Sequence, residues 1–172
     1  MSQAFSRLLE VHQELEDIFL LHGECLLEGE LSLAREVLET YRALLRLHMQ
    51  HEETVLFPLY LEVGVAPRFP LLLYSGQHKK LNALLDAIIR RLHGLEGRGS
   101  AVRRQVLSVF DQETTFKHLV EHHDGAERDG LFARLDEAVV SERAQTLLAP
   151  LWDEWWAARS AIAAPLERAR AL

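Results

Sequence analysis

Apolar residues recur at alternating steps of three and four positions along most of this chain, which is the period of an α-helix with one buried face. No stretch shows the two-residue alternation of a half-buried strand. The sequence therefore predicts an all-α protein. The predicted helical segments cover approximately residues 5–29, 32–64, 70–95, 101–140 and 141–170.

Serine, glycine and proline residues mark the predicted ends of these segments. Ser32 is the predicted N-cap of the second segment, and Gly64 ends it. Residues 94–100 contain three glycines and are predicted to form a loop. Gly125 and Gly130 lie inside the fourth segment, where each weakens a helix by roughly 1 kcal/mol relative to alanine. Close packing or a local bulge there would explain the use of glycine.

Histidine and glutamate side chains interrupt the apolar faces in a repeated order: His, His-x-x-x-Glu, His, His-x-x-x-Glu. Residues four apart stack on one face of a helix, about one turn apart. Two helix pairs repeated in tandem predict an antiparallel up-down four-helix bundle over residues 1–140. Residues 141–172 would form an additional C-terminal helix that packs on the bundle or makes an oligomer contact. The repeated polar residues, called the six-residue cluster below, are His12, His48, Glu52, His78, His123 and Glu127.

The six-residue cluster predicts a metal site. A single histidine on an apolar face is more often a core residue with one hydrogen bond. A buried glutamate, however, costs several kcal/mol unless it is paired or binds a cation. Two glutamates at matched depth beside four imidazoles therefore indicate a bound metal.

The ligand types narrow the choice of metal. Imidazole and carboxylate without thiolate suit iron, manganese or zinc, and six ligands are too many for one tetrahedral zinc ion. Two six-coordinate ions need roughly twelve ligand positions, of which two bridging carboxylates, four imidazoles and one oxo or hydroxo bridge fill about ten. About two positions would then remain for water or a small ligand. The Glu-x-x-His motif of ferritin-type di-iron proteins does not occur.

The stretch 48–58, His-x-x-x-Glu-Glu-x-x-Leu-Phe-Pro, closely resembles the motif of the hemerythrin-like family, also called the HHE cation-binding domain. The resemblance extends from about residue 12 to residue 135. It implies a four-helix bundle around a non-haem di-iron centre, with Glu52 and Glu127 as bridging ligands and the four histidines of the six-residue cluster as terminal ligands. Manganese or zinc would be substitutes. The second copy of the motif is looser, because Phe132 is followed by Ala133 rather than proline.

The resemblance also bears on function. Oxygen-carrying hemerythrins have a further histidine four residues from the third-helix ligand, where this chain has Tyr74 and Asn82. The four-histidine set is similar to that of family members tied to iron-centre repair and nitrosative stress. Tyr74 shares a face with His78, so its hydroxyl would either donate a hydrogen bond toward the metal ligands or pack against a backbone carbonyl.

The histidines outside the cluster are predicted to have other roles. His22 either ends the core or lies near the mouth of the site, and His122 would replace His123 if the helix phase slips at Gly125. Glu53 is either a surface charge or a partner of a ligand. His51 and His118 are predicted to face a different groove from the metal ligands, and His93, near a helix end, is predicted to interact with the carbonyls of the last turn.

Composition restricts the partners. The 172 residues carry a net charge of -7, which argues against a surface built for nucleic-acid backbones or anionic membranes. The lone Cys25 cannot form an intrachain disulfide, and we expect it to be a buried small apolar residue in a cytoplasmic protein. Trp152, Trp155 and Trp156 place too much indole on the last segment for a free surface, so this helix covers the bundle or joins two protomers in a homodimer.

Three kinds of function fit this pattern. The first is a protein that binds or senses O2 or NO at the open metal positions. The second is an iron donor for damaged iron centres, or an enzyme that reduces NO or peroxide in a stress response. The third is a helical scaffold that holds whichever divalent ion is abundant. The first two need the same cage of ligands, and the sequence identifies no catalytic residue.

Overall fold

The computed structural model describes residues 3–64, 68–95 and 100–172, which are helical almost throughout and include no strand. The prediction of an all-α protein is confirmed. A short 3-10 helix, Ser6–Leu8, precedes the first α-helix. The α-helices are α1 (Leu9–Leu27), α2 (Leu31–His51), α3 (Phe57–Glu62), α4 (Leu71–His93), α5 (Ser100–Ala126), α6 (Ala133–Ala138), α7 (Ser141–Ala161) and α8 (Ala163–Ala169).

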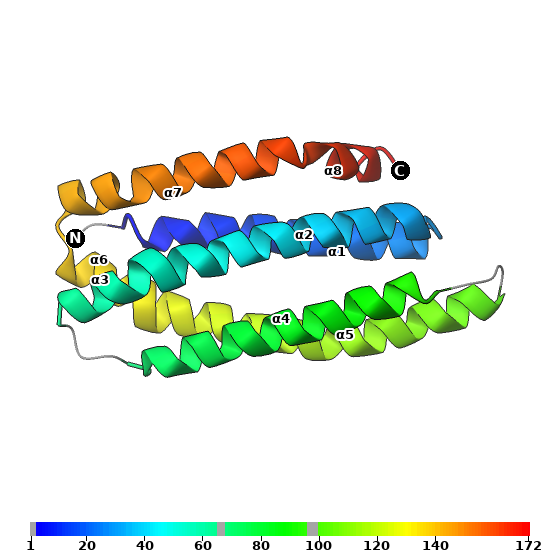
Figure 1. Cartoon of the computed structure of the whole chain (residues 1–172), viewed down its shortest axis with the longest axis horizontal. Coiled ribbons are helices and arrows are strands. Elements are labelled where there is room, and N and C mark those ends of the chain that lie inside the picture. The colour runs from blue at the N-terminus through cyan, green and yellow to red at the C-terminus, as the bar shows by residue number, and fades with distance from the viewer. Residues whose placement is uncertain (1–2, 65–67, 96–99) are drawn as a thin grey trace.

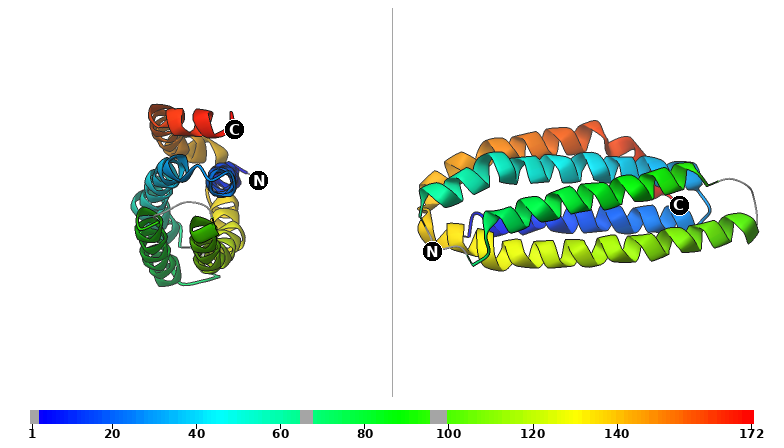
Figure 2. Two further views of the ribbon diagram at one scale, coloured as in Figure 1. Left: turned by 90° about the vertical axis from the view of Figure 1, so that its right-hand side faces the viewer. Right: turned by 60° about the horizontal axis from the view of Figure 1, so that its bottom comes forward.

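The long helices lie side by side along one axis (Figure 1). Helix α3 continues the line of α2, and α6 continues that of α5, after a short π-helix in each case: Glu52–Leu56 and Glu127–Phe132. In the end-on view, α1, α2, α4 and α5 surround a common centre, and α7 with α8 lies outside them (Figure 2). Helices α7 and α8 both contact α2, and α8 also contacts α1.

Local chemistry explains where several helices end. Gly29 and Gly64 follow α1 and α3 with positive φ angles of 81° and 64°, which glycine adopts without steric cost. Helix α2 begins at Leu31 after Glu30, so the predicted N-cap Ser32 is wrong and lies in the first turn. The predicted last segment breaks at Ile162 into α7 and α8. Pro165 explains the break, because it lacks the N–H that would continue the helical hydrogen bonding.

The apolar core has two parts, one on each side of the six-residue cluster. The larger part packs α1, α2, α4 and α5 around residues such as Leu38 and Leu85. The smaller part surrounds α3 and α6 and includes Leu56 and Phe132. Along α2 the larger part ends at Met49, and in the π-helix that follows the smaller part includes Leu56, so the polar layer lies between two apolar clusters.

The C-terminal helices cover one face of the bundle. Trp155 is 2% exposed in the core, whereas Trp156 on the same helix is 52% exposed. Arg159 of α7 donates a hydrogen bond to Glu14 of α1 over 2.6 Å. Trp152 is partly buried against both parts of the core.

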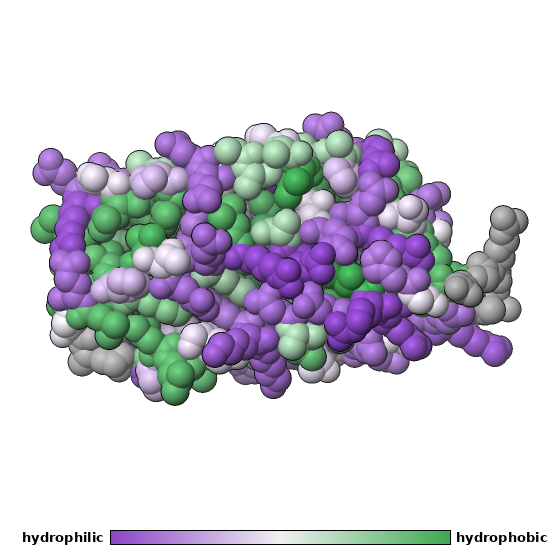
Figure 3. All heavy atoms as spheres, viewed as in Figure 1, coloured by the Kyte–Doolittle hydropathy of each residue, from purple (hydrophilic) through white to green (hydrophobic). Residues whose placement is uncertain are grey.

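The surface is mixed in character. On the face shown in Figure 3, hydrophilic side chains cover the middle of the molecule, and hydrophobic ones gather toward the end that holds α3 and the start of α7. Leu61, Leu72 and Val140 are exposed to 71%, 81% and 71%. No helix of the described residues is long and apolar enough to cross a membrane.

Candidate metal centre

The six-residue cluster comes together in the middle of the bundle, with ligands supplied by α1, α2, α4, α5 and the two π-helices. Its residues form two overlapping groups, in each of which every residue offers one ligand atom and these atoms all lie within 4.8 Å of one another. Both groups share Glu52 and Glu127. The groups are His12, His48, Glu52 and Glu127, and Glu52, His78, His123 and Glu127.

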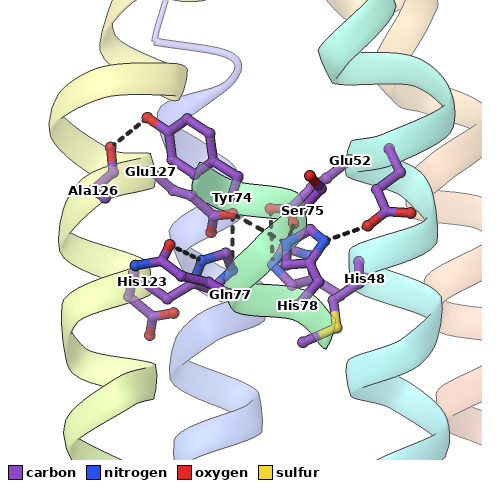
Figure 4. A network of polar contacts seen from close by, with 12 residues as sticks. His48, Glu52, Tyr74, Ser75, Gln77, His78, His123, Ala126 and Glu127 are labelled. Carbon is purple, nitrogen blue, oxygen red and sulfur yellow. Dashed lines mark hydrogen bonds and ion pairs between the residues drawn. The ribbon is translucent and has the colours of Figure 1, made fainter. Parts of the chain in front are cut away.

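The two carboxylates divide their oxygens between the two groups. Oε1 of Glu52 lies 3.1 Å from Nε2 of His48, and its Oε2 lies 3.1 Å from Nε2 of His78 (Figure 4). Glu127 follows the same rule: Oε2 lies 3.3 Å from Nε2 of His12 and Oε1 lies 2.9 Å from Nε2 of His123. Each carboxylate is therefore placed to bind two cations at once, one through each oxygen.

These carboxylates are buried without hydrogen bonds. Glu52 and Glu127 are both 0% exposed, and among the described residues none of their four side-chain oxygens has a hydrogen-bond partner. The neighbouring imidazole nitrogens are close enough but do not have hydrogen-bond geometry; Nε2 of His78 and of His123 is unpartnered as well. Because an unpaired buried carboxylate costs several kcal/mol, this arrangement fits cations that the side chains surround.

Electrostatic coupling inside the cluster is strong. Burial would lower the pKa of His12, but the Glu127 carboxylate outweighs burial and raises that pKa to about 9. The pKa of His78 rises to about 10 against burial, through Glu127 and Glu52. Burial and the Glu127 charge raise the pKa of Glu52 to about 7. The cage without metal thus holds protons where cations would bind, and metals must displace them.

Side chains around the cluster orient two of its histidines, His78 and His123. Nδ1 of His78 donates to Oε1 of Glu53 over 2.7 Å, and Nδ1 of His123 donates to Oε1 of Gln77 over 3.1 Å. Nδ1 of His12 lies 3.7 Å from Oδ1 of Asp124, beyond hydrogen-bond distance. In His78 and His123 the donating Nδ1 leaves Nε2 as the nitrogen that faces the carboxylates, and Nε2 can bind a metal once the metal displaces its proton. Figure 4 shows Gln77 beside His123.

The sequence offered two roles for Glu53, one of them as the partner of a metal ligand, but it did not point to Gln77. Gln77 directly precedes His78 on α4, yet its partner belongs to α5. The three- and four-residue spacing of apolar residues shows which face of a helix is buried, but it does not show which side chains of two helices meet. The two alternatives for Glu53 were a surface charge and a partner of a ligand, and its hydrogen bond agrees with the second.

Each glutamate of the cluster begins a π-helix. The N–H of Phe57 donates to the carbonyl of Glu52, and the N–H of Ala133 donates to that of Arg128; both bonds span five residues instead of four. The wider turn re-aims the side chains that follow the ligand, and π-bulges are frequent at functional sites. For the second π-helix, a local bulge at the glycines was one of the two alternatives considered from the sequence, and the structure shows a wide turn there. For residues 52–56 the sequence predicted uninterrupted α-helix, because the hydrophobic period alone does not distinguish a single wide turn.

Gly130 explains the predicted close packing in the second π-helix. A Cβ atom at this position would lie 2.6 Å from the Tyr74 hydroxyl and 2.9 Å from the Phe69 ring, so no larger residue fits without movement. At Gly125 a Cβ atom would meet nothing closer than 3.9 Å. Only Gly130 is therefore required by its neighbours.

Tyr74 is buried at 1% exposure, and its hydroxyl donates to the backbone carbonyl of Ala126 over 3.1 Å. This is the packing alternative considered from the sequence. The Tyr74 ring meets His123 edge-on at 6.5 Å between centroids. Tyr74 therefore contacts the cluster through its ring and braces the turn that carries Glu127.

The remaining histidines lie outside the cluster. His122 is exposed and His123 is in the cluster, so the helix phase does not slip at Gly125. Nε2 of His51 lies 3.0 Å from Oε2 of Glu154 on α7. His22 is fully buried in the larger core and has hydrogen bonds at both ring nitrogens. Two more are exposed: His93 and His118.

A cavity of about 180 Å³ adjoins the cluster and reaches His12, His48 and His123. Its other walls are mostly apolar, and its exposed lining residues come from α1 and α5. The cavity thus opens to solvent between these two helices and gives small molecules a route to the cluster.

Comparison with known proteins agrees with this site. The model of the hemerythrin HHE cation-binding domain matches residues 3–135, a range that includes every member of the six-residue cluster. No curated protein and no solved structure gave a match.

Proposed function

The chain belongs to the hemerythrin HHE cation-binding domain family, and from this we propose that it is a non-haem di-iron protein that binds or senses a small diatomic molecule, O2 or NO. One observation carries the proposal. Glu52 and Glu127, both fully buried and without hydrogen bonds, each direct one oxygen toward each of two histidine pairs.

In this proposal Glu52 and Glu127 each hold both ions, and the histidines bind as terminal ligands. The two histidine pairs are His12 with His48, and His78 with His123. Glu53 and Gln77 hold the second pair in the tautomer that leaves Nε2 free for a metal. Iron fits this donor set, and manganese or zinc would be substitutes in the same cage.

The diatomic ligand would reach the centre through the cavity between α1 and α5. Roughly ten of twelve coordination positions are filled by protein ligands and a bridging oxygen, which leaves about two for an incoming molecule. When bound, a pair of irons supplies the electrons for binding or reducing such a molecule. The apolar walls of the cavity keep bulk water away from the cluster, since they offer it few hydrogen bonds.

Tyr74 supports sensing or reaction rather than oxygen transport. It occupies the layer where oxygen carriers have a further histidine, so the cage has fewer imidazoles. Its ring narrows the space beside His123. We expect the reduced centre to react with O2 without storing it reversibly.

The alternatives use the same cage. Reduction of NO or peroxide needs the same open positions, and donation of iron to damaged centres needs the metals to leave. All six residues of the cluster are buried, which favours retention of the metals over donation. The hydrogen bonds from His78 to Glu53 and from His123 to Gln77 also favour a dedicated site over an adventitious one.

The arrangement proposed with this function is an antiparallel four-helix bundle of α1, α2, α4 and α5, with α7 and α8 as an added layer. The C-terminal layer, with Trp156 exposed, is the proposed surface for a homodimer. A cytoplasmic location fits the buried free thiol of Cys25, which a reducing compartment preserves.

The test is a purification under anaerobic conditions, followed by measurement of bound metal per chain and exposure to O2, NO and peroxide in turn. Two irons per chain, and a visible spectrum that changes with O2 or NO, are the expected results. Fewer than two metals per chain after reconstitution with iron would refute the di-iron assignment. A full spectrum that no diatomic molecule alters would refute the ligand assignment alone.

A further inference from the structure

The cavity beside the six-residue cluster is larger than a diatomic molecule needs. Its volume is about 180 Å³, and an apolar cavity of about 150 Å³ in another protein accepts benzene. The residues His12, His48 and His123 close its inner end. Its apolar walls include Leu15, Phe19, Leu45, Leu81 and Phe116.

Aromatic rings form one side of the cavity. The ring centroids of Phe19 and Phe116 are 5.3 Å apart in a stacked arrangement, and the ring of Tyr41 lies edge-on to both, at 5.1 and 6.0 Å. Such rings bind a further aromatic ring through offset and edge contacts as well as through buried area. The shape and chemistry of this wall therefore favour a flat aromatic occupant.

Tyr41 also gives the cavity one polar group. It is 2% exposed, and its hydroxyl makes no hydrogen bond to any described residue. The hydroxyl oxygen is not among the fully buried side-chain atoms that lack a partner, so it is accessible from the cavity and can bond to a molecule there. Tyr41 precedes His48 by two helical turns on α2, which places it about 10 Å along the helix axis from that ligand. A molecule in the cavity can thus meet this hydroxyl without touching the metal ligands.

The charges at the mouth restrict the occupant further. Three carboxylates line the cavity, those of Glu16, Glu121 and Asp124, and the permanent cation among the lining residues is Lys117. In the metal-free protein His12 adds a second positive charge, so the carboxylates still outnumber the cations. Nζ of Lys117 lies 5.6 Å from the centroid of the Phe19 ring. The excess of carboxylates disfavours an anion, and the apolar interior disfavours any buried charge that lacks a partner.

We propose that this cavity is a binding site for a small neutral aromatic molecule that carries one hydroxyl group, of the phenol class. The ring packs among Phe19, Phe116 and Leu45, and the hydroxyl exchanges a hydrogen bond with Tyr41. This site goes beyond the proposed binding of O2 or NO, and occupancy of the cavity does not depend on metals in the cluster.

The experiment measures binding of phenol, benzene and benzoate to the full-length protein, without metal and with iron, by ligand-observed NMR and calorimetry. Phenol is expected to bind more tightly than benzene, and benzoate is expected not to bind. The variant Tyr41→Phe should lower the affinity for phenol about fivefold, because it removes one hydrogen bond. Its affinity for benzene should stay unchanged.

Two further variants make the result specific. Tyr60→Phe is the matched control, because the Tyr60 hydroxyl is also buried but donates to the carbonyl of Gly130 outside the cavity. It should preserve the preference for phenol over benzene. Val120→Phe should block both ligands by filling the cavity from α5, with the helical content checked by circular dichroism.

The proposal is overturned if the wild type binds neither phenol nor benzene, or if Tyr41→Phe keeps the full preference for phenol. Metal content is measured on the same samples. If the iron-reconstituted protein binds phenol but holds fewer than two metals per chain, the di-iron assignment is refuted and the cavity site is supported. If the reconstituted protein holds two metals per chain but does not bind phenol, the cavity site is refuted and the di-iron assignment stands.

Discussion

Among the described residues the bundle contains two buried arrangements of histidine and glutamate, and one of them has the properties of a metal site. In the larger core, His22 donates from Nδ1 to the carbonyl of Ala34 over 2.8 Å, and its Nε2 is hydrogen-bonded to Oε1 of Glu113 over 3.0 Å. Both residues are almost fully buried. In the six-residue cluster, burial is equally complete, but both carboxylates lack hydrogen bonds.

The comparison shows that burial of histidine and glutamate does not by itself identify a metal site. His22 is satisfied by one hydrogen bond to Glu113 and one to the carbonyl of Ala34, so this pair needs no cation. The cluster has more acceptors than its own donors can serve in the observed geometry. The backbone differs as well: α1 and α5 are regular helices around His22 and Glu113, whereas each glutamate of the cluster begins a π-helix.

The largest expected effect is on the bridging carboxylates. Glu52→Ala or Glu127→Ala should reduce the metal content from two ions per chain to one or none, because each carboxylate holds both ions. His12→Ala should cost less, since a terminal ligand serves one ion. Metal analysis after dialysis measures the difference, with Glu113→Ala as the matched buried control. Two irons retained in a Glu52→Ala protein would contradict the bridging role.

For the His22–Glu113 pair we expect a loss of stability without a loss of metal. Glu113→Ala leaves His22 without its side-chain partner in the core and should lower the free energy of unfolding by about 3 kcal/mol. The metal content should stay at two per chain. Urea unfolding of the metal-free protein, together with metal analysis, checks both parts. If Glu113→Ala loses metal while the fold stays equally stable, the two arrangements are not independent.

The π-helix after Glu127 can be tested through Gly130. Gly130→Ala should lower the free energy of unfolding by about 1–3 kcal/mol, because the new methyl group overlaps the Tyr74 hydroxyl. The double variant with Tyr74→Phe should recover part of this loss, since that hydroxyl is then absent. Thermal unfolding of the single and double variants gives the coupling. Gly125→Ala, where a Cβ atom has room, is the control and should not destabilise the protein.

The smallest expected effect concerns the support of His123. Gln77→Ala removes the acceptor of the His123 Nδ1 proton and should weaken metal binding about tenfold without changing the number of ions bound. Competition with a chelator measures the affinity. Asn82→Ala, on the same helix, is the control, because the Asn82 amide contacts Met49 and the His78 carbonyl and no imidazole nitrogen. An equal affinity for the Gln77→Ala protein would show that packing alone orients His123.

Spacing along the chain made much of the site predictable. The repeated His-x-x-x-Glu and the two single histidines placed six side chains on inward faces, because residues four apart share one side of a helix. The structure brings the same six together. His122, the alternative ligand to His123, lies on the exposed face of α5 because the helix keeps its phase through Gly125.

Other features depended on contacts between elements that are distant in the chain. Gln77 supports His123 across two helices, Tyr74 restricts Gly130 to glycine, and Tyr41 faces a cavity formed by four helices. Likewise, nothing local distinguishes His22, which is satisfied by Glu113, from the histidines of the cluster.

The sequence by itself determined that this protein is helical, which residues face inward and which of them repeat, because periodicity and local spacing are properties of the chain. Only the tertiary structure decided which buried polar atoms find hydrogen-bond partners and which remain for a cation. That outcome depends on the distance and orientation of groups on neighbouring helices, and packing of the whole bundle sets both.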